Sequence, residues 1–196
     1  RDPESLPPVP APSDLLPPPN HFYVTPAQFH AAYAQGIIIR DIRHKYFTQS
    51  IPPPPPNGNQ VHEFGSQVDM QVSMDGGQSW RPMRAPALTT VALRHVGGGP
   101  VCNPCMFETE MLQLGIAGGD LPPGVMLRES PTRRSLGGTA LRHLPDGTAV
   151  INSFFDVFTE LSVDSGQSWA PADTEAHVEL TFNAPESPHS GPNLPP

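Results

Sequence analysis

The sequence lacks features that mark several functional classes. It has 11 lysine and arginine residues against 19 aspartate and glutamate residues, a formal net charge of −8 at pH 7. An acidic chain without a Lys/Arg run is not expected to bind nucleic acid. No stretch approaches the roughly 18 consecutive apolar residues of a membrane-spanning helix, so we expect no membrane span.

Recognisable catalytic sets are missing as well. The Gly-x-Ser-x-Gly turn of serine hydrolases does not occur in the sequence. A glycosidase needs two facing carboxylates, and 19 acidic residues supply candidates without selecting a pair. We therefore predict no catalytic residue, no cofactor and no metal, and a protein that is not an enzyme.

Cysteine is scarce, and both cysteines fall in one motif, Cys102-Asn103-Pro104-Cys105. We predict a local disulfide, because a redox motif of this spacing belongs at a helix N-terminus and glycines precede this one. A zinc site needs further ligands, for which His95 and His143 are conceivable. His44, His95 and His143 each follow an arginine. We interpret them as solvated strand ends, with anion binding as the alternative.

One eight-residue stretch occurs twice, as Ser73–Trp80 and as Ser162–Trp169. In each copy a short Asp side chain can accept hydrogen bonds from backbone N–H groups just ahead of it and close a tight turn. A glycine two residues later allows a positive φ, and the tryptophan can cover the turn. The Glu that ends a calcium-binding EF-hand loop is absent, so we favour a structural turn over a calcium loop.

The two stretches resemble the Asp-box, a hairpin turn of sialidases and related β-propellers. The resemblance implies a structural turn lying away from any active site, and it carries over no catalytic residue. The matching residues are Ser73, Asp75, Gly77, Trp80, Ser162, Asp164, Gly166 and Trp169.

The repetition extends beyond the turn. Gly36–Arg40 precedes the first copy, and Gly124–Arg128 precedes the second at nearly the same distance. A period of roughly ninety residues suits a duplicated half-domain better than a solenoid unit. We predict related halves at about 36–95 and 124–182; chance similarity around one shared turn is the alternative.

Proline is the abundant residue, with 28 in the chain. Pro-rich stretches prefer the extended polyproline II form and do not build sheet interiors. We therefore expect an N-terminal arm at 1–19, one domain at 20–182 and a C-terminal tail at 183–196. The sequence from Thr25 to Gly36 predicts a short helix, with Thr25 as its N-cap and Pro26 in its first turn.

Short alternating apolar runs separated by turn residues predict an all-β fold, an antiparallel β-sandwich built from the two halves. Val68, Met70 and Val72 lie on the buried face of one such run. In the second half, Phe154 and Phe158 lie on the opposite, polar face. We interpret the two rings as covered in the protein rather than open to solvent, and as contacts for assembly.

Segments 23–30, 40–44 and 154–162 are similar to secreted bacterial proteins of unassigned function, which implies an extracellular or cell-surface location. We expect a mature chain whose signal peptide has been removed, or a trimmed one. The sequence favours a structural subunit that self-assembles with copies of itself into a filament or surface layer through its Pro-rich arms. A carbohydrate-binding module that binds polysaccharide is the alternative, with Trp80, Trp169, Phe154 or Phe158 as stacking platforms, and a secreted glycosidase is third.

Overall fold

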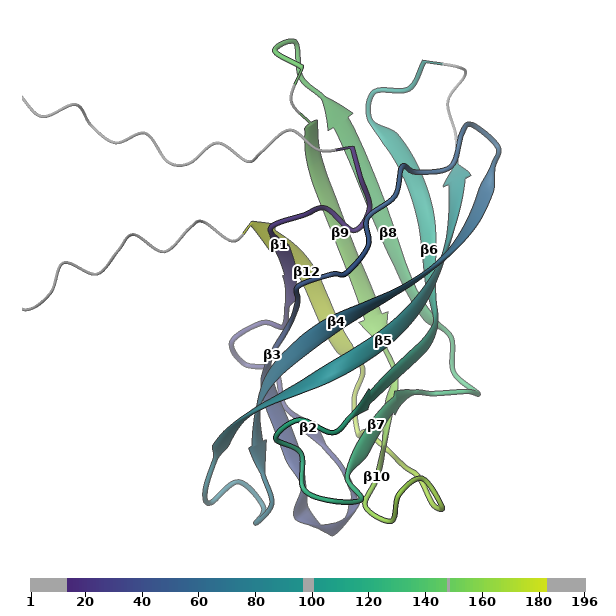
Figure 1. Ribbon diagram of the computed structural model, residues 1–196. Helices are drawn as coiled ribbons and strands as arrows, with labels where there is room; N and C mark the ends of the chain where they lie inside the picture. Colours follow the sequence, from purple (N-terminus) through teal and green to yellow (C-terminus); the bar gives the residue numbers. More distant parts are fainter. Residues whose placement is uncertain (1–13, 97–100, 148, 183–196) are drawn as a thin grey trace, which may run out of the picture.

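Twelve β-strands and one 3-10 turn (Ala34–Gly36) form the part of the chain that the computed structural model describes, residues 14–96, 101–147 and 149–182 (Figure 1). The strands are β1 His21–Val24, β2 Ala31–Ala32, β3 Ile38–Lys45, β4 Asn59–Ser73, β5 Arg81–Val96, β6 Cys105–Ala117, β7 Met126–Glu129, β8 Ser135–His143, β9 Ala149–Val157, β10 Thr159–Ser162, β11 Ala170–Pro171 and β12 Ala176–Phe182.

Antiparallel pairing joins the strands into an 8-stranded barrel, which the pairing of the first strand with the last one closes. Its order is β1-β3-β4-β5-β6-β8-β9-β12, and β12 then pairs with β1 through His21↔Phe182 to Val24↔Glu179. In Figure 1 the long strands β4 and β5 cross the front of the barrel at a steep tilt. Strand tilt of this kind is what allows a sheet to close on itself.

The strands β7 and β8 share one place in the barrel wall. Both pair with β6, β7 through Gly115–Ala117 and β8 through Cys105–Met111. On their other side β7 pairs with β10 and β8 pairs with β9. Residues 130–134 leave the wall between β7 and β8, so one strand position is built from two pieces with an excursion between them.

The all-β, antiparallel class is confirmed, but the sheet does not separate into the two layers of the predicted sandwich. A sandwich leaves sheet edges unpaired, whereas pairing of β1 with β12 and of β6 with β8 removes them here. Bulges between Arg40 and Arg43 and between Thr90 and Val91 interrupt the ladders and bend the long strands. The sequence predicts the strands, and their long-range pairing decides the architecture.

The predicted helix is wrong: residues 25–36 contain β2 and the 3-10 turn instead. The groups of Thr25 that would cap a helix bind β3, because its N–H donates to Ile42 O and its Oγ1 accepts from Ile42 N–H. Ala31–Ala32 pairs with Ile38–Ile39, and Ala31 is buried. Tertiary pairing thus overrides the local helix signal. No helix in the described ranges is long and apolar enough to span a membrane.

Alternate residues of the strands fill the barrel interior. The predicted inward residues Val68, Met70 and Val72 are all buried, and in the second half so are Phe155, Val157 and Leu161. Two internal cavities measure only about 40 and 50 Å³. Such volumes suit a few waters and not an organic ligand. The interior is therefore a packed core.

Part of the predicted N-terminal arm belongs to the barrel. Leu16 is buried and exchanges two backbone hydrogen bonds with Ile51, and the Ser50 hydroxyl donates to Pro17 O. Pro18 is fully buried as well. Residues 16–18, within the predicted arm, therefore pack on their own chain. The remainder of the predicted arm, 1–13, and the predicted tail, 183–196, lie outside the described residues.

The two turn stretches occupy similar places in the wall. The predicted first half, 36–95, contains β3, β4 and β5, and the predicted second half, 124–182, contains β7 to β12. Ile38 pairs with Ser73 at the first turn stretch, and Met126 pairs with Ser162 at the second. A duplication of the two halves stays a prediction.

A substitution at Gly137 on β8 tests how closely the backbone of β8 packs against β9 and β6. A Cβ there would lie 2.1 Å from Phe154 O and 2.7 Å from Thr109 Oγ1, so Gly137→Ala forces the backbone to shift. We expect it to destabilise the fold by about 1–3 kcal/mol. Gly115→Ala on β6 is the matched control, since a Cβ there meets nothing within 4 Å. Equal unfolding midpoints in urea for the two variants would contradict this packing.

Candidate functional site

The first turn stretch connects β4 to β5 and is closed by side chains. Ser73 Oγ donates to Asp75 Oδ1 at 2.8 Å and accepts the Gly77 N–H at 2.8 Å. Asp75 Oδ1 accepts the Ser79 N–H at 2.9 Å, and its Oδ2 accepts the Ser79 hydroxyl at 2.5 Å. These bonds hold the pKa of Asp75 at about 2, with the Ser79 hydroxyl the largest cause. The carboxylate therefore stays charged in the turn.

The second stretch connects β10 to β11 with the same bonds. Ser162 Oγ donates to Asp164 Oδ1 at 2.7 Å and accepts the Gly166 N–H at 2.8 Å. Asp164 accepts the Ser168 N–H at 2.9 Å and the Ser168 hydroxyl at 2.5 Å, and the pKa of Asp164 also falls to about 2. Gly77 and Gly166 have φ of 93° and 84°, and the preceding Ser165 adopts a positive φ of 59° as well.

Each turn carries a tryptophan stacked on an arginine. The Arg40 guanidinium lies 3.8 Å from the Trp80 ring centroid, and that of Arg128 lies 4.1 Å from the Trp169 ring centroid. Both rings are half-buried. They thus cover their turns only in part, and the arginines complete the cover.

The two arginines differ in their partners across the strand. Arg128 faces Glu160 and donates to its Oε2 from Nε at 3.0 Å and from Nη2 at 2.7 Å. Arg40 faces Gln71, and its buried Nε has no hydrogen-bond partner among the described residues. The second turn therefore has a complete Trp–Arg–Glu set, and the first does not.

A groove of about 720 Å³ lies on the outer wall beside the second turn. Strands β5, β6 and β7 form its floor. Its exposed and half-buried lining residues include Pro86, Leu88, Leu112, Arg128, Glu129 and Trp169. An apolar floor with a few polar groups and one aromatic ring is the usual composition of a ligand site.

Glu129 at the end of β7 is the unusual group of this groove. Burial raises the pKa of Glu129 to about 7, and the nearby carboxylates Glu110 and Glu160 raise it further, while a hydrogen bond from the Ser135 hydroxyl at 3.0 Å lowers it. The side chain is therefore partly protonated near neutral pH and can both donate and accept a hydrogen bond. No pattern in the sequence distinguishes Glu129 among the 19 acidic residues.

The predicted assembly residues Phe154 and Phe158 lie in different surroundings. Phe154 is 41% exposed on the outer face of β9, beside Gly138 and stacked on His177 with ring centroids 5.7 Å apart. Phe158 is half-buried, and the Arg133 guanidinium lies 3.8 Å from its ring centroid. Phe154 is thus open to a partner, and Phe158 is covered by its own chain.

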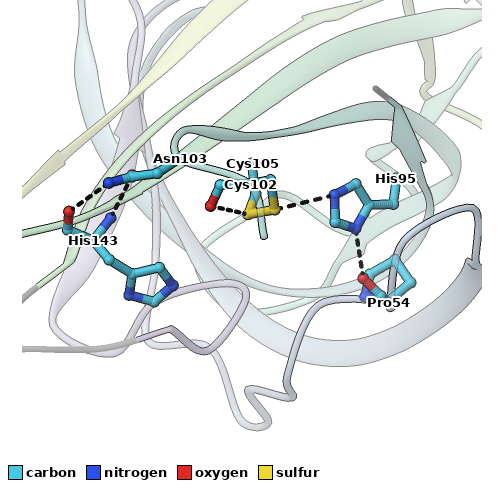
Figure 2. Close-up of a disulfide and its surroundings, with 6 residues drawn as sticks. All are labelled: Pro54, His95, Cys102, Asn103, Cys105 and His143. Carbon is cyan, nitrogen blue, oxygen red and sulfur yellow. Dashed lines mark hydrogen bonds between the residues drawn. A yellow bond between two sulfur atoms is a disulfide. The ribbon is translucent and has the colours of Figure 1, made fainter. Parts of the chain in front are cut away.

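Cys102 and Cys105 form a disulfide at the start of β6 (Figure 2). Asn103 between them holds the loop to β8, since its side chain donates to His143 O and accepts from the His143 N–H. Of the three histidines interpreted as strand ends, His44 is buried inside the barrel, His95 is buried beside the disulfide, and His143 is exposed. His44 cannot join an exposed anion site.

No family model, no curated protein and no solved structure matches this chain.

His44 makes the stability of the barrel depend on pH. Burial lowers the pKa of His44 from 6.5 to about 4. Between these two pH values the imidazole is therefore protonated in the unfolded chain and neutral in the folded chain. Stability should fall as the pH drops from 6.5 to 4, by about 3 kcal/mol from this group. We expect His44→Gln to remove this part of the pH dependence in urea unfolding, with exposed His143→Gln as the control. Parallel curves for wild type and His44→Gln would contradict a neutral buried imidazole.

Proposed function

We propose that the chain is a non-enzymatic extracellular structural subunit that self-assembles with copies of itself, into a filament or surface layer. The observation that carries this proposal is an apolar area on the outer wall of the barrel. We call it the outer apolar patch and define it by Val61, Leu88, Leu112 and Leu136. Exposed apolar residues gathered on one sheet face are typical of protein-binding surfaces.

The strand register places Val61 and Leu136 at the two ends of one row across the sheet, with Ala92 and the ion-paired Glu110 between them. Val61 on β4 pairs with Ala92 on β5, which pairs with Glu110 on β6, which pairs with Leu136 on β8. Val61 is 65% exposed and Leu136 is 46% exposed, so the two ends of this row face outward. The patch therefore crosses four neighbouring strands.

Charge favours a second copy as the partner of this surface. The chain has a net charge of −8, which opposes self-association in general. At the patch, however, Arg94 pairs with Glu108, and Arg134 pairs with Glu110. These pairs cancel part of the charge around the patch, so two copies meet less repulsion between like charges there than the net charge implies.

Two further features support the proposal. The disulfide between Cys102 and Cys105 fits an oxidising, extracellular compartment. Phe154 lies on β9 opposite Gly138, two residues beyond Leu136 on β8, and extends the apolar surface. A proline-rich arm stacks well on such a ring, and it loses little conformational entropy on docking. The arms thus add a second contact to the one made by the patch.

The proposal predicts self-association that depends on the patch. In analytical ultracentrifugation the wild type should associate with rising concentration, and Leu136→Lys should weaken the association at least tenfold because it places a charge in an apolar contact. Met74→Lys is the control, since Met74 is 44% exposed on the first turn, away from the patch. A variant beginning at Asp14 keeps the packed residues 16–18 and measures the contribution of the arm.

A wild type that stays monomeric at every concentration, or a Leu136→Lys variant that associates like the wild type, would overturn assembly through the patch. Folding of each variant is checked by circular dichroism. Equal association by the variant beginning at Asp14 would remove the arm from the proposal and leave the patch.

Carbohydrate binding is the second candidate function, and the groove beside Trp169 favours it. Sugars bind through the stacking of their apolar faces on aromatic rings and through hydrogen bonds from their hydroxyls. Trp169, Arg128 and Glu129 line this groove together and supply both kinds of contact. Trp80 is stacked on its arginine in the same way but is not among the residues of this groove.

This difference provides a matched pair of variants. If the groove binds polysaccharide, Trp169→Ala should lose about tenfold in affinity, and Trp80→Ala should lose nothing. The measurement is affinity electrophoresis in gels containing soluble xylan or hydroxyethyl cellulose. Equal retardation of both variants, or none of the wild type, would contradict a sugar site at Trp169.

A further inference from the structure

The imidazole of His95 is buried with one nitrogen aimed at the disulfide. His95 is 6% exposed, and its Nδ1 lies 3.0 Å from Pro54 O (Figure 2). A carbonyl oxygen only accepts, so Nδ1 carries the proton of this hydrogen bond, and in the neutral ring Nε2 keeps its lone pair. Nε2 lies 3.5 Å from Cys102 Sγ, and a disulfide sulfur has no proton to donate. The lone pair thus faces the sulfurs without a donor.

The three side chains already have nearly the spacing of metal ligands. His95 Nε2, Cys102 Sγ and Cys105 Sγ lie within 4.8 Å of one another. Zinc binds sulfur at about 2.3 Å and imidazole nitrogen at about 2.0–2.1 Å, so neighbouring N and S ligands of a tetrahedral ion are about 3.5 Å apart. The observed distance from Nε2 to Cys102 Sγ is 3.5 Å. Only the two sulfurs would have to separate.

The surroundings fix the imidazole and leave the sulfurs accessible. The bond from Nδ1 to Pro54 O is the outer contact that orients a metal-binding histidine. The backbone N–H of His95 donates to Gly58 O. The centroid of the Phe107 ring lies 4.6 Å from the centroid of the imidazole. Cys105 lies on β6, and both cysteines are half-buried. The nitrogen is therefore preorganised, and the sulfurs can be reached by a reductant.

We propose that reduction of the Cys102–Cys105 disulfide creates a site for a thiophilic metal ion, held by the two sulfurs and His95 Nε2. A dithiol reductant supplies two electrons and two protons. The S–S bond breaks to give two thiols, and the reductant is oxidised to its own disulfide. Metal binding then displaces the two thiol protons. With Zn²⁺, water completes the tetrahedron as the fourth ligand.

The disulfide and the metal site exclude each other, so the same residues have two states. The oxidised chain has a covalent link across a loop of sequence separation 3, and the reduced chain has a metal link that adds His95 on β5 to the two cysteines. The metal thus adds a side-chain link between β5 and β6, whose backbones are already paired at His95 and Phe107, whereas the disulfide links only Cys102 and Cys105. This site is independent of the outer apolar patch and of the groove beside Trp169.

The test compares reduced and oxidised full-length protein. Protein reduced with a phosphine, which is then removed under anaerobic conditions, is titrated with Zn²⁺ against a chromophoric chelator. We expect one ion per reduced chain and none on the oxidised chain. Cys102→Ser and His95→Asn should each weaken binding at least tenfold. His143→Asn is the matched control, since His143 contacts the same loop through its backbone only, and it should bind like the wild type.

Two measurements on the unaltered chain keep the test decisive if His95→Asn misfolds. The thermal midpoint of reduced wild type should rise on addition of Zn²⁺, and Co²⁺ in its place should give the thiolate charge-transfer and tetrahedral bands of an S₂N site. A parallel titration with Cu⁺ shows whether a three-coordinate ion binds as well. Absence of binding by reduced wild type, binding by the oxidised chain, or unchanged affinity in folded His95→Asn would each overturn the proposal.

Discussion

The rest of the structure depends on the backbone pairing that joins the two ends of the sheet. If β12 did not bind β1, the chain would expose two long edges. Closure also fixes which residues face inward, because the period of a strand is two and a shift by one residue would exchange the two faces. Val68 and Phe155 are buried, and Val61 and Phe154 are exposed, as a result of this register.

Several elements of this fold follow from the sequence, and others do not. The strands around Val68 and Phe155 and the two turn stretches are local patterns, and the structure has strands and turns at those positions. Barrel closure depends on contacts between residues about 160 positions apart, such as His21 and Phe182, which no local pattern encodes. The helix predicted at Thr25 fails for the same reason, since its capping groups are bound by β3.

The candidate sites were harder to predict than the fold. Glu129 becomes unusual only because the fold buries its carboxyl group near Glu110 and Glu160. His95 stands out only because Pro54 O, from a distant loop, accepts a hydrogen bond from its Nδ1 and so leaves Nε2 facing the disulfide. In both cases the residue itself has no distinguishing pattern around it in the sequence, and the groups that change its properties come from distant segments. The sequence could identify the two cysteines and name His95 and His143 as candidates beside them, but it could not choose between the two histidines.

The two turn stretches are alike, but the wall beside each of them differs. The turn residues are identical in role, since Asp75 and Asp164 make the same bonds to the serines around them. The neighbouring wall is not the same, because Gln71 occupies the place that Glu160 has in the second half. A turn held by its own side chains needs nothing from the strands beside it, so those strands are free to diverge. Of the two turns, the second therefore has the complete Trp–Arg–Glu set, and it lies beside the groove at Trp169.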